Sequence, residues 1–237
     1  MTIKGIKAIL PDPTVVVPED YSDRIISVDT SIYLYKYVYG FRESFIKGFK
    51  SLVKTWKKNT IIFVLDGKSP ELKKGLIQAR KTLRDSREDT DKNKIKITEE
   101  TIQELKDYID NLKDPKVTYL QAPGEAEKYC AEMNKKGDCD FILTNDFDTF
   151  LFGGKNIIRN IKSQEYHLYS IESILEHLKV TFEQFTEICV ACGCDYNLKG
   201  LPGYGPKKAL KFILENKTFG TLIDEPFQLA LDEFKAL

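Results

Sequence analysis

Residues 25–40 read IISVDTSIYLYKYVYG, and this stretch decides the fold. A short, mostly apolar run ends at an acid, Asp29, and the chain then continues in a pattern that predicts a helix ending near Gly40. A second such run follows at residues 60–66, which read TIIFVLD and end at Asp66. Buried strands that pass directly into helices are typical of a parallel sheet.

The same alternation continues along the chain. Further strands are predicted at residues 117–120, 141–144 and 156–161, and helices at 44–56, 70–84, 98–112, 123–133, 171–178, 182–192 and 206–216. Residues 85–96 are polar and show no period, which predicts a loop, and the tail from residue 218 is expected to be helical. We therefore expect an α/β fold, with a mostly parallel central sheet flanked by helices over residues 1–170 and a helical subdomain over residues 171–237.

The composition is that of an ordinary globular protein, with 237 residues, 42% apolar and 30% charged. No apolar run approaches the roughly 18–20 residues that cross a membrane. The N-terminus lacks the apolar stretch of a secretory signal. We therefore expect an intracellular protein with no membrane partner.

The chain has five cysteines, and three of them lie close together at Cys189, Cys192 and Cys194. A structural zinc site needs four ligands in paired spacings, which His167 and His177 do not complete. An odd number of cysteines in an intracellular protein favours free, buried thiols over disulfides.

The formal net charge is zero, but the charges are unevenly distributed. Residues 47–84 hold eleven Lys or Arg and two acids, whereas residues 122–150 hold seven acids and three Lys. Basic segments around an acidic centre suit a protein that grips a polyanion while holding cations. The lysines at 47–58 would equally form the solvated face of a helix.

Seven acids recur at or next to the end of an apolar run or in a sharp turn: Asp29, Asp66, Glu125, Glu127, Asp146, Asp148 and Asp195. The ligand sites of open α/β sheets lie beyond the carboxyl ends of the strands, so a parallel sheet would gather these acids at one edge. Crowded carboxylates repel one another unless cations lie between them, which indicates bound divalent metal. Two metal ions held in this way are the usual apparatus for attack of water on a phosphodiester, so the acids predict a metal-dependent nuclease.

Any one of these acids alone also has a structural explanation. Asp29 would fit a helix cap, Asp146 a capping turn, and Glu127 the positive end of a helix dipole. The shared position of all seven favours a metal site over seven separate explanations.

Residues 203–208 read GYGPKK, a glycine-rich turn directly before a predicted helix. Glycines allow backbone amides to face outward, and a following helix adds its dipole, so such a turn binds phosphate. Because the turn lies between two predicted helices, it is typical of a helix–hairpin–helix, which grips DNA phosphates without reading sequence. A plain tight turn is the structural alternative.

Taken together, these motifs resemble those of the flap endonuclease family of structure-specific 5′-nucleases. The matching stretches occur in the family's order between residues 25 and 213: IISVDTSIYLY, IIFVLDGKSPELKKGLIQAR, YLQAPGEAEKYCAEM, FILTNDFDTFLFGGKNIIRN and ACGCDYNLKGLPGYGPKKALKFI. The resemblance implies a PIN-like nuclease core with a short arch at about residues 70–112 and a helix–hairpin–helix at about residues 182–216.

The resemblance also implies the roles of single acids. Two Mg²⁺ ions, with Mn²⁺ as a substitute, would be held by two groups of acids: Asp29, Asp66, Glu125 and Glu127, and then Asp146, Asp148 and Asp195. Catalysis would depend most directly on Asp29, Asp66, Glu127 and Asp148.

Basic and aromatic residues gain roles from the same resemblance. Lys73 and Arg80 match a basic pair that the family places over the scissile phosphate, where they would take part in catalysis and bind DNA. Tyr35 matches an aromatic that stacks on a base beside the cut, with core packing as its structural alternative. The grip on the uncut duplex, where K⁺ is often also held, would come from Gly203, Gly205, Lys207 and Lys208.

Three features depart from the family pattern. Thr2 stands where the family usually has glycine close to the active site. The arch segment is short, and the chain ends soon after the hairpin, without the usual extension. Gln228, Leu231 and Phe234 match part of a sliding-clamp peptide, but a terminal amphipathic helix explains the same residues, and Lys235 takes the final aromatic position.

We therefore expect a monomeric nuclease that cuts flapped or branched double-stranded DNA at a site of replication, whether nuclear, viral or organellar. The nearest alternative is a 5′→3′ exonuclease, or a gap or junction endonuclease, of the same family. A non-catalytic DNA-binding scaffold is less favoured because all seven acids are present. An RNA-directed nuclease on a related sheet is a further alternative, which the hairpin disfavours.

Overall fold

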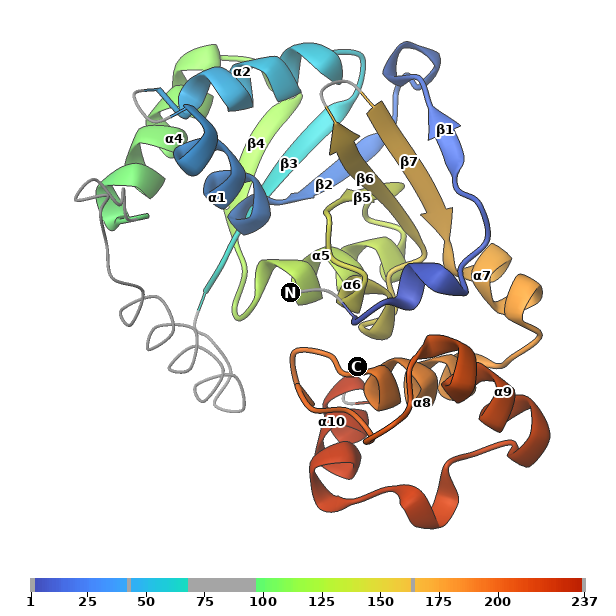
Figure 1. The fold of residues 1–237 in the computed structure, drawn as a ribbon. Helices are drawn as coiled ribbons and strands as arrows, with labels where there is room; N and C mark the ends of the chain where they lie inside the picture. Colours follow the sequence, from blue (N-terminus) through green and yellow to red (C-terminus); the bar gives the residue numbers. More distant parts are fainter. Residues whose placement is uncertain (1–2, 42–43, 68–96, 163–164, 236–237) are drawn as a thin grey trace.

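The computed structural model describes residues 3–41, 44–67, 97–162 and 165–235 (Figure 1). Within these residues one sheet runs through the molecule in the order β1-β7-β6-β5-β2-β3-β4. Its strands are β1 (Thr14–Val16), β2 (Ile25–Asp29), β3 (Thr60–Leu65), β4 (Val117–Gln121), β5 (Phe141–Leu143), β6 (Asn156–Lys162) and β7 (Glu165–Ser170). Strands β6, β5, β2, β3 and β4 are parallel, whereas β7 and β1 add antiparallel pairs at one edge. The expected mostly parallel sheet is confirmed.

One face of the sheet is covered by α1 (Thr30–Phe41), α2 (Ile46–Thr55) and α4 (Glu99–Leu112), which lie together in Figure 1. Their apolar sides bury Phe49, Trp56 and Leu105 against sheet residues such as Phe63. A capping box between Thr98 and Thr101 begins α4 where the sequence predicts a helix start. These contacts make one of the two apolar cores.

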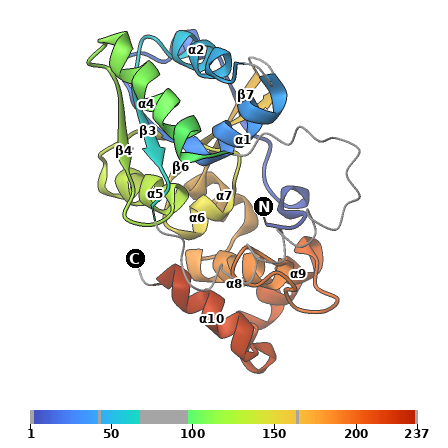
Figure 2. The same ribbon diagram turned by 90° about the vertical axis from the view of Figure 1, so that its left-hand side faces the viewer.

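The second core lies on the other face, under α5 (Ala126–Lys136) and the short α6 (Asp148–Leu151), and continues into α7 (Ile171–Leu178), α8 (Phe182–Cys192), α9 (Pro206–Asn216) and α10 (Glu225–Lys235). Figure 2 shows α8, α9 and α10 as a layer below the part that carries the sheet. Short 3-10 turns complete the described elements: η1 (Ile6–Ala8), η2 (Pro18–Asp20) and η4 (Gly220–Leu222). Because Ile142 and Phe150 share this core with Phe185 and Ile213, the two parts pack as neighbours.

The structure corrects several predicted boundaries. The helix expected at 123–133 begins at Ala126 and ends at Lys136, because Glu125 is its extended N-cap and Gly137 ends it with a left-handed backbone. Strands β1 and β7, the short helix α6 and the 3-10 turns η1 and η2 were not predicted from the sequence. The helix and loop expected at 70–84 and 85–96 fall outside the described residues, as do Thr2, Lys73 and Arg80.

The expectation of free, buried thiols is borne out. All five cysteines are free and buried. No helix in this part of the chain combines the length and apolarity that crossing a bilayer requires.

Candidate active site

The carboxyl ends of three neighbouring strands form the centre of the site. Strand β2 lies between β3 and β5, and all three run parallel. Asp29 is the last residue of β2, Asp66 follows β3 directly, and Asp146 comes three residues after β5. Acids from segments far apart in the chain therefore meet at one sheet edge, as the sequence predicts.

Asp66 is held by the start of a helix. Its Oδ1 accepts a 2.7 Å hydrogen bond from the amide of Ala126, the first residue of α5, and its Oδ2 accepts one from the Ser31 hydroxyl. A carboxylate at this place is stabilised by the helix dipole. Gly67 allows the turn that brings the chain there, because a Cβ at this position would lie 2.2 Å from the carbonyl oxygen of Ala122.

A chain of hydrogen bonds connects the remaining aspartates. The Thr144 hydroxyl donates to Asp29 over 3.0 Å and accepts from the amide of Asp146 over 3.2 Å. The amide of Asp148 donates to Asp146 over 3.1 Å, and the amide of Asp195 donates to Asp148 over 3.1 Å. These aspartates are thereby fixed relative to one another.

Asp195 and its neighbour come from the helical layer rather than from the sheet. Asp195 follows α8, and Tyr196 donates a 2.6 Å hydrogen bond to Glu125 Oε2 at the start of α5. Glu127 lies in the first turn of α5 and is half-buried. Six of the predicted acids thus lie at the carboxyl ends of β2, β3 and β5 or at the starts of α5 and α6, and the seventh, Asp195, contacts Asp148.

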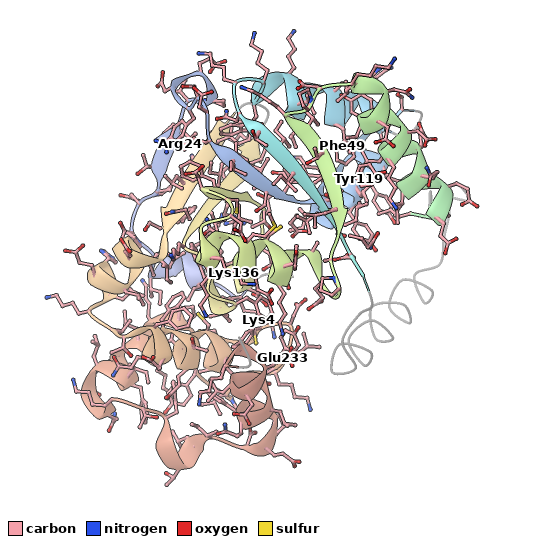
Figure 3. The ribbon with its side chains drawn as sticks, turned by 180° about the vertical axis from the view of Figure 1, so that it is seen from behind. Lys4, Arg24, Phe49, Tyr119, Lys136 and Glu233 are labelled. Carbon is pink, nitrogen blue, oxygen red and sulfur yellow. The ribbon has the colours of Figure 1, made fainter. Side chains whose placement is uncertain are left out.

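Two polar contacts hold the helical layer against the part that carries the sheet. Lys128 on α5 pairs with Glu233 on α10 at 3.2 Å, and Lys4 donates to the carbonyl oxygen of Leu198. Figure 3 shows Lys4 and Glu233 at the boundary between the two parts. The hydrogen bond from the Asp195 amide to Asp148 crosses the same boundary.

Crowding of negative charge alters the acidity of the central aspartate. Burial, followed by repulsion from Asp66 and Asp146, raises the pKa of Asp29 to about 7, although the hydrogen bond from Thr144 lowers it. A divalent cation bound there would offset this repulsion, and oxygen donors alone suit a hard ion. Among the residues that the structure describes, no three Asp, Glu, His or Cys side chains lie close enough together to coordinate one metal ion. The donor chemistry therefore fits a metal, and binding would have to draw the carboxylates closer together.

The predicted phosphate grip is a turn between α8 and α9. Gly203 has φ +78°, a left-handed conformation that favours glycine, and Gly205 is the N-cap of α9. Pro206 occupies the first turn of that helix, followed by Lys207 and Lys208, which are exposed. The turn thus joins two helices where the sequence predicts them, with two exposed lysines at the N-terminus of the second helix.

The structure also identifies supporting residues that were not predicted from the sequence: Ser31, Gln121, Thr144 and Tyr196. Thr144 and Tyr196 each lie within two residues of a predicted acid, and this proximity is the signal that could have found them. Tyr35, in contrast, is exposed on α1, so its alternative role in the core is excluded.

Comparison with known proteins agrees with this geometry. The XPG N-terminal domain family matches residues 1–87, and the XPG I-region family matches residues 116–195. Flap endonuclease 1 of Methanococcus aeolicus is 34% identical over 184 residues, which are 70% of this chain and 55% of that protein. The chain therefore spans about half the length of the curated relatives that it matches.

Solved structures show the same likeness. The catalytic core of Rad2 in complex with DNA substrate is 31% identical, with a TM-score of 0.73, and the match covers 87% of this chain and 66% of that one. Flap endonuclease-1 of Methanococcus jannaschii shares the fold at 22% identity, with a TM-score of 0.64 over 95% of this chain and 83% of that one. With both XPG regions and the seven acids in place, this chain belongs to the flap endonuclease family of nucleases.

Proposed function

We propose that this chain is a structure-specific 5′-nuclease that hydrolyses phosphodiester bonds of flapped or branched DNA in replication or repair. The acids gathered at the carboxyl ends of β2, β3 and β5 carry the proposal, because a divalent cation would stabilise them in their ionised form. Burial, with added repulsion from Asp66 and Asp146, raises the pKa of Asp29 to about 7, which agrees with such a site. The names of the relatives support the same activity, since they include flap endonuclease 1 and a Rad2 core solved with DNA substrate.

We propose Mg²⁺ as the metal, bound as two ions, with Mn²⁺ as a substitute. The residues that would hold the ions are Asp29, Asp66, Glu125, Glu127, Asp146, Asp148 and Asp195. When bound, such ions activate water and neutralise charge on the phosphate. The protein contributes the fixed positions of these acids, through α5, Thr144 and Tyr196.

DNA would be held at two further places. The turn at Gly203 and Gly205 would bind phosphates of the uncut duplex through its backbone amides, and Lys207 and Lys208 would add positive charge. K⁺ is proposed to bind at the same turn. Lys73 and Arg80, which lie outside the described residues, are proposed to offset charge on the scissile phosphate.

Clamp binding has less support from the structure. Leu231 and Phe234 on α10 are 4% and 5% exposed, so both contribute to the apolar core. A sliding clamp could bind these two side chains only if they left the core. The amphipathic pattern of α10 already accounts for their spacing. A monomeric state and a location at sites of DNA replication remain predictions.

The proposal is tested with a 5′-labelled flap on a nicked duplex, incubated with Mg²⁺ or with EDTA and mapped at nucleotide resolution. One metal-dependent cut near the flap base is expected. A ladder of single-nucleotide products would instead indicate an exonuclease. Preferred cleavage of gapped or four-way DNA would indicate a gap or junction endonuclease. Cleavage confined to an RNA flap would indicate an RNA-directed nuclease.

A matched pair of variants connects the result to the site. Asp148→Asn is expected to abolish cleavage while retaining DNA binding, whereas Asp138→Asn on the exposed surface should behave as wild type. Binding without cleavage by the wild-type protein would favour the scaffold. Full activity of Asp148→Asn would overturn the site assignment.

A further inference from the structure

Helix α1 presents two tyrosines to solvent. Tyr35 and Tyr39 are 55% and 49% exposed. Every other Phe, Tyr or Trp side chain whose burial the structure describes is buried or half-buried. The two exposed rings are therefore an exception within the described part of the chain, and they are neighbours.

The two rings have the same orientation. Their planes differ by 5° and their centroids lie 6.2 Å apart. Residues four apart on a helix are separated by about 6 Å along its axis, so the two rings follow one another along one side of α1. The pair is therefore two parallel rings that are each about half exposed.

Packing of the protein itself does not explain this pair. The same helix sends Tyr33 and Tyr37 into the apolar core, where they are 0% and 9% exposed. An i, i+4 contact between exposed aromatics adds only about 0.2–0.5 kcal/mol to a helix. Two large rings left in water on the helix that follows Asp29 indicate that something planar binds there.

The position of the rings relative to the carboxylates identifies the ligand. Tyr35 and Tyr39 lie six and ten residues after Asp29, or ~9 and ~15 Å along a helix. Stacked nucleotides are about 3.4 Å apart along one strand, so both rings are within a few nucleotides of a phosphate at the acids. Aromatic side chains bind unpaired bases of any sequence by stacking, whereas paired bases hide their faces.

We propose that Tyr39 acts together with Tyr35 as a two-ring stacking site for unpaired bases of the strand that enters the carboxylate site. This inference rests on the proposed function, since it takes DNA as the ligand. The family resemblance assigns stacking on a base to Tyr35 only and gives no role to Tyr39. The second ring would extend the contact by at least one base.

The test measures base stacking without cleavage. A single-stranded oligonucleotide carrying 2-aminopurine is titrated with the full chain in EDTA, and fluorescence and anisotropy are followed. Replacing one stacking aromatic by alanine should weaken binding by about 5- to 100-fold and reduce the fluorescence change. This loss is expected for both Tyr39→Ala and Tyr35→Ala.

Matched variants separate stacking from simple apolar contact and from folding. Tyr39→Phe keeps the ring and should bind almost as wild type, whereas Tyr39→Leu keeps apolar area without the ring and should bind as Tyr39→Ala. The double alanine variant should deviate from the sum of the single losses, because the two rings contact one strand. Melting temperatures and binding to blunt duplex should stay close to those of wild type.

Equal binding by Tyr39→Leu and wild type, or a loss matched by a fall in melting temperature, would overturn the inference. The result is distinguishable from failure of the proposed function, because no cleavage is involved. A wild-type chain that never cuts DNA but shows ring-dependent binding refutes only the nuclease. A wild-type chain that cuts flaps and binds unpaired bases independently of Tyr39 refutes only the stacking site.

Discussion

Tyr196 donates a 2.6 Å hydrogen bond from its hydroxyl to Oε2 of Glu125, although the two residues are 71 positions apart in the chain. The amide of the preceding residue, Asp195, donates to Asp148. Two adjacent residues from the loop after α8 therefore hold acids at the starts of α5 and α6. The helical layer thus takes part in building the carboxylate site as well as in the proposed DNA grip.

Tyr196→Phe removes this hydrogen bond and keeps the ring that packs at 6.0 Å from Phe152 and 5.3 Å from Phe234. Loss of an outer partner of a metal-binding carboxylate typically costs about 10- to 100-fold in metal affinity or activity. We expect the Mg²⁺ concentration for half-maximal cleavage to rise within this range, as measured by titration with Mg²⁺ at saturating flap DNA.

A change in folding would give a different result. Because the ring is kept, the melting temperature in EDTA should be nearly unchanged. An unaltered Mg²⁺ requirement in Tyr196→Phe would show that the bond does not position Glu125.

Asp29→Asn is expected to stabilise the metal-free protein above neutral pH. The pKa of Asp29 is raised from 3.8 to about 7 in the folded state, so the folded protein binds this proton more tightly than the unfolded chain does. The free energy of unfolding of the wild type therefore falls as pH rises from about 4 to 7 and then levels off. The gain from Asn should grow over the same range and reach about 4 kcal/mol at most.

The measurement is urea unfolding of both proteins in EDTA between pH 4 and 9. Mg²⁺ should stabilise the wild type more at pH 8 than at pH 5.5, because its ligands bind metal when deprotonated. A stability difference between Asp29→Asn and wild type that is the same at every pH would contradict the raised pKa.

Lys207→Ala with Lys208→Ala should weaken binding to duplex DNA, because both side chains are exposed in the first turn of α9. For every phosphate that the variant no longer binds, the slope of log affinity against log salt should become shallower by about one. Fluorescence anisotropy at several salt concentrations measures this slope. Lys211→Ala, further along the same helix and paired with Glu215, is the control and should leave the slope unchanged. An unchanged slope in the double variant would exclude phosphate binding at this turn.

Gly67→Ala should displace Asp66, because the added Cβ would lie 2.2 Å from the carbonyl oxygen of Ala122 and 2.9 Å from the backbone of Pro123. Overpacking of this kind costs about 1–3 kcal/mol of stability. Misplacement of a catalytic group can lower the rate by up to about 100-fold. Flap cleavage and thermal unfolding would measure both effects.

The matched control for this substitution is Gly40→Ala on α1, where nothing lies within 4 Å of the added Cβ. It should stabilise the helix by about 1 kcal/mol or less. Normal activity and stability of Gly67→Ala would show that the turn can relax without moving Asp66.

Strong local patterns determined most of the fold. The apolar runs that form β2 and β3, and the capping box at Thr98, predict elements that the structure contains at nearly the same residues. Strands β1 and β7 were not predicted because their pairing across the edge of the sheet stabilises segments with weak periodicity of their own. The boundary of α5 was misplaced because Glu125 reads as helical in the sequence but serves as an extended N-cap.

The sequence by itself determined which acids lie around the carboxyl ends of the strands, because residues at strand ends and in the first turn after them can be recognised from local pattern. Only the tertiary structure decided how they are held. The contacts of Thr144 with Asp29, Tyr196 with Glu125 and the Asp195 amide with Asp148 join segments that are distant in the chain. The raised pKa of Asp29 has the same origin, since desolvation and repulsion depend on which charges the fold brings near and on how much water it excludes.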